Sequence, residues 1–156
     1  MIIGVLKEPS PETRVSLLPE HVAILKKWNV DVLVESNAGV TAFANDGKYT
    51  EAGANIKSRS EVLQRSDFIV SINALPQSEI TDLKSKVILG VYQPLFNAGL
   101  MKELAAKGLT VFSMDMLPRT TRAQSMDILS SQANIAGYKA VLLAANLFPK
   151  YFPMFM

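Results

Sequence analysis

The sequence of 156 residues contains no cysteine and only one histidine, His21. The absence of cysteine excludes disulfide bonds, thiolate metal sites and a cysteine nucleophile, and one histidine cannot build a histidine metal cluster. Charged residues are also scarce, at 19% of the chain, and 16 lysines and arginines against 14 acidic residues leave a net charge of +2. Because no basic run occurs, we expect no nucleic-acid partner. Because cysteine is absent and histidine occurs once, we expect no bound metal.

Long uninterrupted hydrophobic runs are missing as well. The N-terminus has no basic region followed by a long apolar stretch, which argues against a signal peptide. The most apolar region, residues 135–156, is interrupted by lysines, asparagine and prolines, whereas a membrane span needs roughly 20 mainly apolar residues. We therefore expect a cytoplasmic chain without a membrane span.

Short apolar runs are abundant and alternate with amphipathic stretches. Hydrophobic residues make up 49% of the sequence, enough for the core of one domain. Five runs have the length and the branched or aromatic content of strands, and several are apolar on both faces, as in parallel strands covered by helices. These runs are residues 2–6, 32–34, 68–72, 87–91 and 110–112.

Helical patterns lie between these strands. Pro19 begins one helix, in which Val22, Leu25 and Trp28 form an apolar stripe. Other expected elements are helices over residues 60–64 and 97–107, the second ending before Gly108, and turns at residues 37–39 and 45–47. The βαβα alternation predicts an α/β fold with a mainly parallel sheet and helices on both faces.

From Asp127 the pattern becomes that of one long helix. Small and apolar residues recur at helical spacing up to Phe148, and a helix of about 20 residues would be about 30 Å long. We expect residues 1–126 to form an N-terminal α/β domain, and residues 127–156 to form a crossover helix and the start of another domain. The apolar end, which includes Tyr151, Phe152 and Phe155, is expected to promote self-association.

One polar cluster follows the first strand. Lys7, Glu8 and Arg14 belong to a proline-rich loop, and the carboxyl ends of parallel strands are where α/β proteins place ligands. We nevertheless favour a solvated loop held by ion pairs. Isolated groups such as His21 and Glu35 are interpreted as surface or strand-end side chains.

A second polar cluster lies between the last strand and the long helix. Residues 119–131 combine arginine, glutamine, aspartate and serine, whose donors and acceptors suit an amide and a ribose, as in a nicotinamide nucleoside. Asp127 as a helix N-cap beside surface arginines explains the same composition equally well. The eight glycines form no Gly-x-Gly-x-x-Gly pattern, so the chain carries no dinucleotide fingerprint.

These clusters carry a family resemblance along the whole chain. Residues 3–8 (IGVLKE), 12–20 (ETRVSLLPE) and 49–54 (YTEAGA) resemble the opening of the family that contains alanine dehydrogenase and the NAD(P) transhydrogenase alpha subunit. Residues 118–127 (PRTTRAQSMD) and 129–138 (LSSQANIAGY) resemble more specifically its proton-translocating transhydrogenase branch. The resemblance implies a flavodoxin- or Rossmann-like sheet ending in a long crossover helix.

The resemblance also implies a site and an activity. In that branch an Arg-Gln-Asp loop lies over the nicotinamide of NAD(H), which implies catalytic and cofactor-binding roles for Arg119, Gln124 and Asp127. Ser130 and Tyr138 are implied as further cofactor-binding residues. The implied activity is hydride transfer between NADH and NADP, coupled to proton translocation in the intact complex, and these 156 residues alone are expected to be inactive.

The partners follow from the same resemblance. It implies a homodimer, a beta subunit that binds NADP(H), and a membrane component, with this chain at the inner, cytoplasmic face of the cell membrane. The glycine fingerprint would belong to a following Rossmann domain.

Two other functions are considered. An alanine-dehydrogenase-like amino-acid oxidoreductase would bind a substrate carboxylate with Arg14. However, Ser71 and Gln93 stand where that enzyme's pattern has lysine and histidine, and oxidative deamination needs groups that transfer protons. Hydride transfer between two nicotinamides needs mainly two rings held face to face. The remaining alternative is a non-catalytic interaction domain of the same fold.

Overall fold

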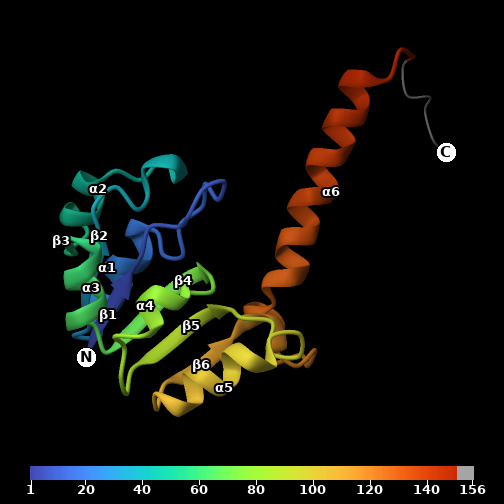
Figure 1. Ribbon diagram of the computed structural model, residues 1–156. Coiled ribbons are helices and arrows are strands. Elements are labelled where there is room, and N and C mark those ends of the chain that lie inside the picture. Colours follow the sequence, from blue (N-terminus) through green and yellow to red (C-terminus); the bar gives the residue numbers. More distant parts are fainter. Residues whose placement is uncertain (151–156) are drawn as a thin grey trace. The chain divides into compact units, whose positions relative to one another are not determined.

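The computed structural model describes residues 1–150 and divides the chain into two compact units (Figure 1). The first unit covers Met1–Met114 and contains the whole sheet, and the second begins at Asp115. The aromatic cluster expected at the end of the chain, residues 151–156, lies outside the described residues.

A six-stranded sheet, in which every strand pairs parallel to its neighbours, forms the centre of the first unit. The strand order is β3-β2-β1-β4-β5-β6. The strands are β1 (Ile2–Val5), β2 (Asp31–Glu35), β3 (Asn55–Lys57), β4 (Phe68–Asn73), β5 (Val87–Val91) and β6 (Thr110–Ser113). The order reverses between β1 and β4, so the loops after these two strands diverge from a common point at the carboxyl edge.

Helices cover both faces of the sheet, as predicted. They are α1 (Pro19–Lys27), α2 (Asp46–Glu51), α3 (Arg59–Arg65), α4 (Gln77–Ile80) and α5 (Ala98–Ala106). The second unit contains the remaining helix, α6 (Ile128–Leu147). Val22 of α1 and Tyr49 of α2 belong to one buried cluster with Val32 and Val34 of β2. Leu33, between those two valines, belongs to a second cluster on the opposite face.

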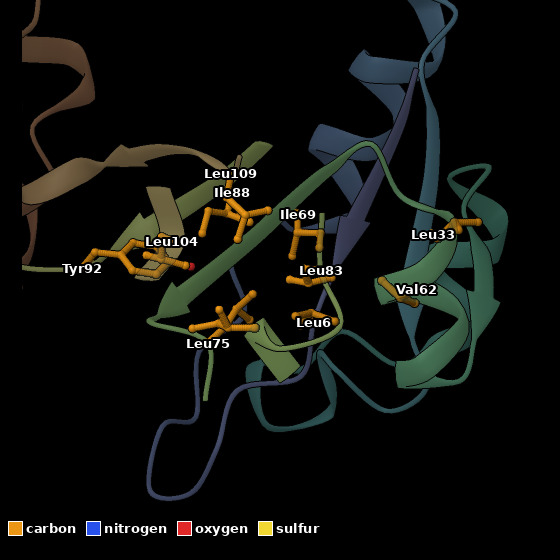
Figure 2. Close-up of a cluster of buried hydrophobic side chains, with 11 residues drawn as sticks. Leu6, Leu33, Val62, Ile69, Leu75, Leu83, Ile88, Tyr92, Leu104 and Leu109 are labelled. Atoms are coloured by element: carbon orange, nitrogen blue, oxygen red, sulfur yellow. The ribbon is translucent and has the colours of Figure 1, made fainter. Parts of the chain in front are cut away.

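This second cluster joins the helices α3, α4 and α5 to the middle of the sheet (Figure 2). Val62, Ile80 and Leu104 project from the three helices, and Ile69 and Ile88 from β4 and β5, all fully buried. Each such side chain stabilises the fold by roughly 1.5–3 kcal/mol through removal from water. The apolar positions of the strands therefore determine which face each helix covers.

Gly4 permits the close approach of α3 to β1. A Cβ at this position would lie 2.3 Å from Ser66 Oγ and 2.8 Å from Val62 Cγ1. Ser58 begins the helix with a capping box, in which its side chain accepts a hydrogen bond from Glu61 N and the Glu61 carboxylate accepts one from Ser58 N. The small residue Gly4 and the N-cap Ser58 therefore allow α3 to pack closely against β1.

Three short elements, β3, α2 and α4, were not predicted from the sequence. The turn predicted at residues 45–47 is wrong, because Asn45 accepts a hydrogen bond from Lys48 N and begins α2. The same residue types favour turns and helix N-caps, so the pattern alone could not separate them. β3 escapes detection because it is an edge strand of three residues, two of them polar.

The apolar stripe predicted for the first helix is wrong at Trp28. Val22 is fully buried, but Trp28 is the C-cap of α1 and is 69% exposed. Because α1 ends one residue earlier, the helical periodicity no longer directs Trp28 toward the sheet.

The long helix predicted from Asp127 is confirmed as α6, with Asp127 as its N-cap. All its residues from Leu129 onward are exposed, including Ile135, Leu143 and Leu147. The apolar residues are spread around the helix rather than gathered in one stripe, a pattern typical of helices that are covered on several sides. Among residues 1–150, no helix is long and apolar enough to cross a membrane.

Candidate functional site

The candidate site lies on the segment that leads from β6 to α6. After β6 the chain forms a 3₁₀ turn at Met114–Met116, a loop, and a second 3₁₀ turn at Gln124–Met126. The second turn runs directly into the N-cap of α6. The loop is therefore joined directly to the helix start.

Asp127 fixes the junction between loop and helix. Its Oδ1 accepts hydrogen bonds from Leu129 N and Ser130 N, each at 3.0 Å, and its Oδ2 accepts one from Ser130 Oγ at 2.6 Å. The Ser130 hydroxyl, followed by the backbone amides and the charge of Arg119, lowers the pKa of Asp127 below its ordinary value. The carboxylate is thus held ionised at the positive end of the helix dipole.

A cavity of about 330 Å³ lies beside this junction. Its lining residues are Pro118, Arg119, Thr120, Thr121, Gln124, Asp127 and Ser130. The structure therefore brings together four of the predicted site residues, Arg119, Gln124, Asp127 and Ser130, around one space.

The side chains of Arg119 and Gln124 differ from that of Asp127 in their surroundings. Both are exposed, and within residues 1–150 neither makes a side-chain hydrogen bond. Arg119 offers a planar set of N–H donors, and Gln124 offers both a donor and an acceptor. Such a set can contact an amide or a diol, and it contains no thiol or histidine that could serve as a nucleophile or general base.

Tyr138, also predicted as a site residue, does not line this cavity. It is 70% exposed on α6, eleven residues after Asp127 and therefore about 16 Å farther along the helix axis. The described residues thus leave Tyr138 separate from the other four.

The loop after β1 is only partly the solvated loop that the sequence favoured. Arg14 is paired with Glu12 through two contacts, Nε–Oε1 at 2.8 Å and Nη2–Oε2 at 2.6 Å. Glu8, in contrast, is 7% exposed and accepts hydrogen bonds from Ile72 N, Asn73 N and Asn73 Nδ2. The pairing of β4 with β5 shifts register between Val70 and Asn73, next to this contact. No pattern in the sequence predicts the burial of Glu8.

A second cavity, of about 390 Å³, lies at the carboxyl edge where the strand order reverses. Its lining residues are Leu6, Lys7, Glu8, Pro9, Glu35, Arg59, Ser71, Asn73, Ala74, Leu75, Pro76 and Glu79. Sequence reasoning named Lys7, Glu8, Glu35 and Ser71 but missed Arg59, a lone arginine at the first position of a short helix.

The two positions compared with alanine dehydrogenase are placed differently. Ser71 is buried, and its hydroxyl donates to the Asn73 carbonyl. Gln93 is exposed in the loop after β5, has a positive φ of 48°, and does not line that cavity. Neither side chain can replace a lysine or a histidine in proton transfer near neutral pH.

Comparison with known proteins shows the family to which the chain is related. Residues 4–136 match the family described as "Alanine dehydrogenase/PNT, N-terminal domain". The NAD(P) transhydrogenase subunit alpha of Haemophilus influenzae is 42% identical over 154 residues, which cover 97% of this chain and 30% of that protein. The alanine dehydrogenase of Staphylococcus saprophyticus is 29% identical over 155 residues, which cover 97% of this chain and 41% of that protein.

Solved structures agree with these relatives. The transhydrogenase from Sinorhizobium meliloti superposes with a TM-score of 0.91 at 38% identity, over 100% of this chain and 47% of that one. An L-alanine dehydrogenase superposes with a TM-score of 0.83 at 26% identity, over 94% of this chain and 40% of that one. The chain thus spans less than half the length of these relatives. The resemblance stated from the sequence is confirmed, and the chain belongs to the alanine dehydrogenase/PNT N-terminal domain family.

Proposed function

We propose that the chain forms the N-terminal part of the NAD(H)-binding component of a proton-translocating transhydrogenase. In the intact complex this enzyme transfers hydride between NADH and NADP and couples the transfer to proton movement. The observation that carries the proposal is the cavity in which Arg119, Gln124, Asp127 and Ser130 meet at the start of α6. Its donors and acceptors fit the carboxamide and ribose of a nicotinamide nucleoside.

Each side chain has a separate task in this proposal. Arg119 and Gln124 bind the carboxamide and the ribose, because their side chains are exposed and lack hydrogen bonds within the described residues. Asp127 and Ser130, bonded to each other and to the helix start, keep the loop in place. Tyr138 contacts the nucleotide from farther along α6.

The chemistry requires orientation more than acid–base groups. NADH, when bound, supplies the hydride, and no proton is exchanged at the reacting carbons. The loop's contribution is to hold one ring in the geometry of transfer, and a misplacement of about 1 Å costs on the order of a hundredfold in rate. The lack of histidine and cysteine in the cavity is compatible with that role.

Other parts of the complex supply the remaining contacts. In this proposal residues 127–156 are a crossover helix and the start of a Rossmann domain, which binds the pyrophosphate at a helix N-terminus. The component acts as a homodimer with an NADP(H)-binding beta subunit and a membrane component, at the cytoplasmic face of the cell membrane.

Two titrations with NADH test the division of the binding site. Calorimetry on the 156-residue chain should give a Kd no tighter than millimolar, or about 4 kcal/mol of binding free energy. A chimera in which residues 1–150 replace the corresponding part of the Haemophilus influenzae subunit should bind NADH far more tightly. Assembled with the NADP(H)-binding beta subunit, this chimera should also transfer hydride to an NADP analogue. Micromolar binding by the short chain, or a chimera that binds NADH without transferring hydride, contradicts the proposal.

The similarity to alanine dehydrogenases favours an amino-acid oxidoreductase as the second candidate. In that case Arg14 would bind a substrate carboxylate, yet its guanidinium is already paired with Glu12. The same chimera, given pyruvate, ammonia and NADH, should show no amination. Turnover near 10 per second, about the median for enzymes, would favour this second candidate.

A further inference from the structure

Arg59 joins four elements at the carboxyl edge of the sheet. From the first turn of α3, its Nε and Nη2 donate to the two carboxylate oxygens of Glu79 on α4, at 2.6 and 2.9 Å. Its Nη1 donates to Glu35 Oε2 at the end of β2, at 2.7 Å, and to the Lys7 carbonyl after β1, at 3.0 Å. Lys7 N donates to the same Glu35 oxygen at 2.8 Å.

This arrangement is partly buried and matched in charge. The side chains of Arg59, Glu35 and Glu79 are 31%, 14% and 20% exposed. Burial alone would lower the pKa of Arg59, but the hydrogen bonds and charges of Glu79 and Glu35 outweigh it and raise that pKa. A planar guanidinium makes paired bonds to one carboxylate while its third nitrogen reaches other acceptors, which a compact ammonium cannot do.

The location is the one where α/β sheets usually take a ligand, outside the carboxyl ends of the strands at which the order reverses. Here four side chains that line the cavity of 390 Å³ are bonded to neighbouring protein groups. Glu8 accepts from the end of β4, Ser71 donates to a carbonyl of the same strand, and the Glu35 and Glu79 carboxylates bind Arg59.

We propose that Glu35, Glu79 and the Lys7 carbonyl form a guanidinium site that the chain fills with its own Arg59. Filling this site ties the loop after β1 to β2 and α4 at the reversal point of the sheet. The chemical class that the site accepts is a planar monocation of the guanidinium type. The inference concerns the first unit alone and does not depend on the proposed transhydrogenase activity.

Chemical rescue of Arg59→Ala tests this assignment. This substitution should lower the melting temperature of the 156-residue chain by about 5 °C. The expected loss lies between that from removing an exposed ion pair and that from breaking a buried one. Millimolar methylguanidinium should restore part of this loss, whereas methylammonium at the same concentration should not. The matched control is Arg65→Ala, at the exposed end of the same helix, which should melt near the parent and respond to neither cation.

The conservative variant keeps the test decisive if Arg59→Ala does not fold. Arg59→Lys preserves the charge but loses the paired bonds to Glu79, so it should melt below the parent. The proposal is overturned if Arg59→Lys melts at the parental temperature. It is also overturned if methylguanidinium stabilises Arg59→Ala no more than it stabilises Arg65→Ala.

Discussion

The two polar segments, the loop of residues 7–14 after β1 and residues 118–130 at the start of α6, use similar side chains in opposite ways. In the first loop Glu8 is buried against the amides of β4, and Arg14 is paired with Glu12. In the second loop Arg119 and Gln124 are exposed around a cavity. A charged residue bonded to the framework stabilises the fold, whereas one without such bonds is available to a ligand.

The largest expected effect that tests this difference between the two segments is on the rate of hydride transfer. In the chimera with the Haemophilus influenzae subunit, assembled with the NADP(H)-binding beta subunit, Gln124→Ala or Arg119→Ala should slow hydride transfer on the order of a hundredfold, because the ring is no longer held in place. The affinity for NADH should change much less, since the adenosine and pyrophosphate contacts remain. Stopped-flow transfer to an NADP analogue and a separate NADH titration measure the two effects.

Arg122→Ala is the matched control for that pair, because Arg122 belongs to the same loop but does not line the cavity. It should transfer hydride at the parental rate. Parental rates for both Arg119→Ala and Gln124→Ala would mean that the loop is merely a polar connection.

The next effect is on stability and involves the first loop. Glu8→Ala leaves two backbone amides and the Asn73 amide without their buried acceptor, which should lower the free energy of unfolding by about 3 kcal/mol. Urea unfolding of the 156-residue chain measures this loss. Glu51→Ala, on the exposed side of α2, is the control and should be nearly neutral. If the two variants were equally stable, the contrast between the loops would fail.

A smaller effect distinguishes the role of Asp127 in the helix from its role in the site. Because its pKa is lowered, its contribution to the start of α6 is complete above the ordinary value of 3.8 and is lost as the pH falls through the folded pKa. Circular dichroism of the parent should therefore show helix loss on acidification in that range. Asp127→Asn should lack this transition. An identical acid profile for both proteins would contradict the capping role.

The smallest effect is expected at the Arg14–Glu12 ion pair of the first loop. The hydrogen bonds from Arg14 lower the pKa of Glu12 to about 2, so the contribution of Glu12 is present above pH 4.5 and is lost as the pH falls toward 2. Arg14→Ala should return this pKa toward 4.5, measured by NMR titration. The cost in stability should stay below about 1 kcal/mol, because the Arg14 side chain is 49% exposed and water replaces part of its contact with Glu12.

The sheet was predictable because its five longer strands are short apolar runs with few interruptions. Residues 87–91 were predicted as a strand with the bounds that the structure has. β3 was not predictable, because it is held by its pairing with β2 rather than by its own residues. A hydrophobic pattern in the sequence predicts a strand whose side chains face the core. It does not predict a strand that is held only by pairing with its neighbour.

The residues of the two cavities also differ in how far the sequence predicts them. The residues from Arg119 to Ser130 are close in sequence, and the N-cap of α6 brings them together locally, so they could be named without a structure. Arg59, Glu35 and Glu79 are separated by 20 residues or more, and only the crossing from β2 through α3 to α4 joins them. A lone arginine near a serine-rich helix start carries no signal of that contact.

The exposure of Trp28, the sole tryptophan, determines what its fluorescence can report. Its indole is already largely in water in the folded state, so its emission should change little on unfolding, and dichroism is the better probe of denaturation. An indole in water emits in the band that dihydronicotinamides absorb. Trp28 therefore meets the spectral condition for energy transfer to a dihydronicotinamide without any added label.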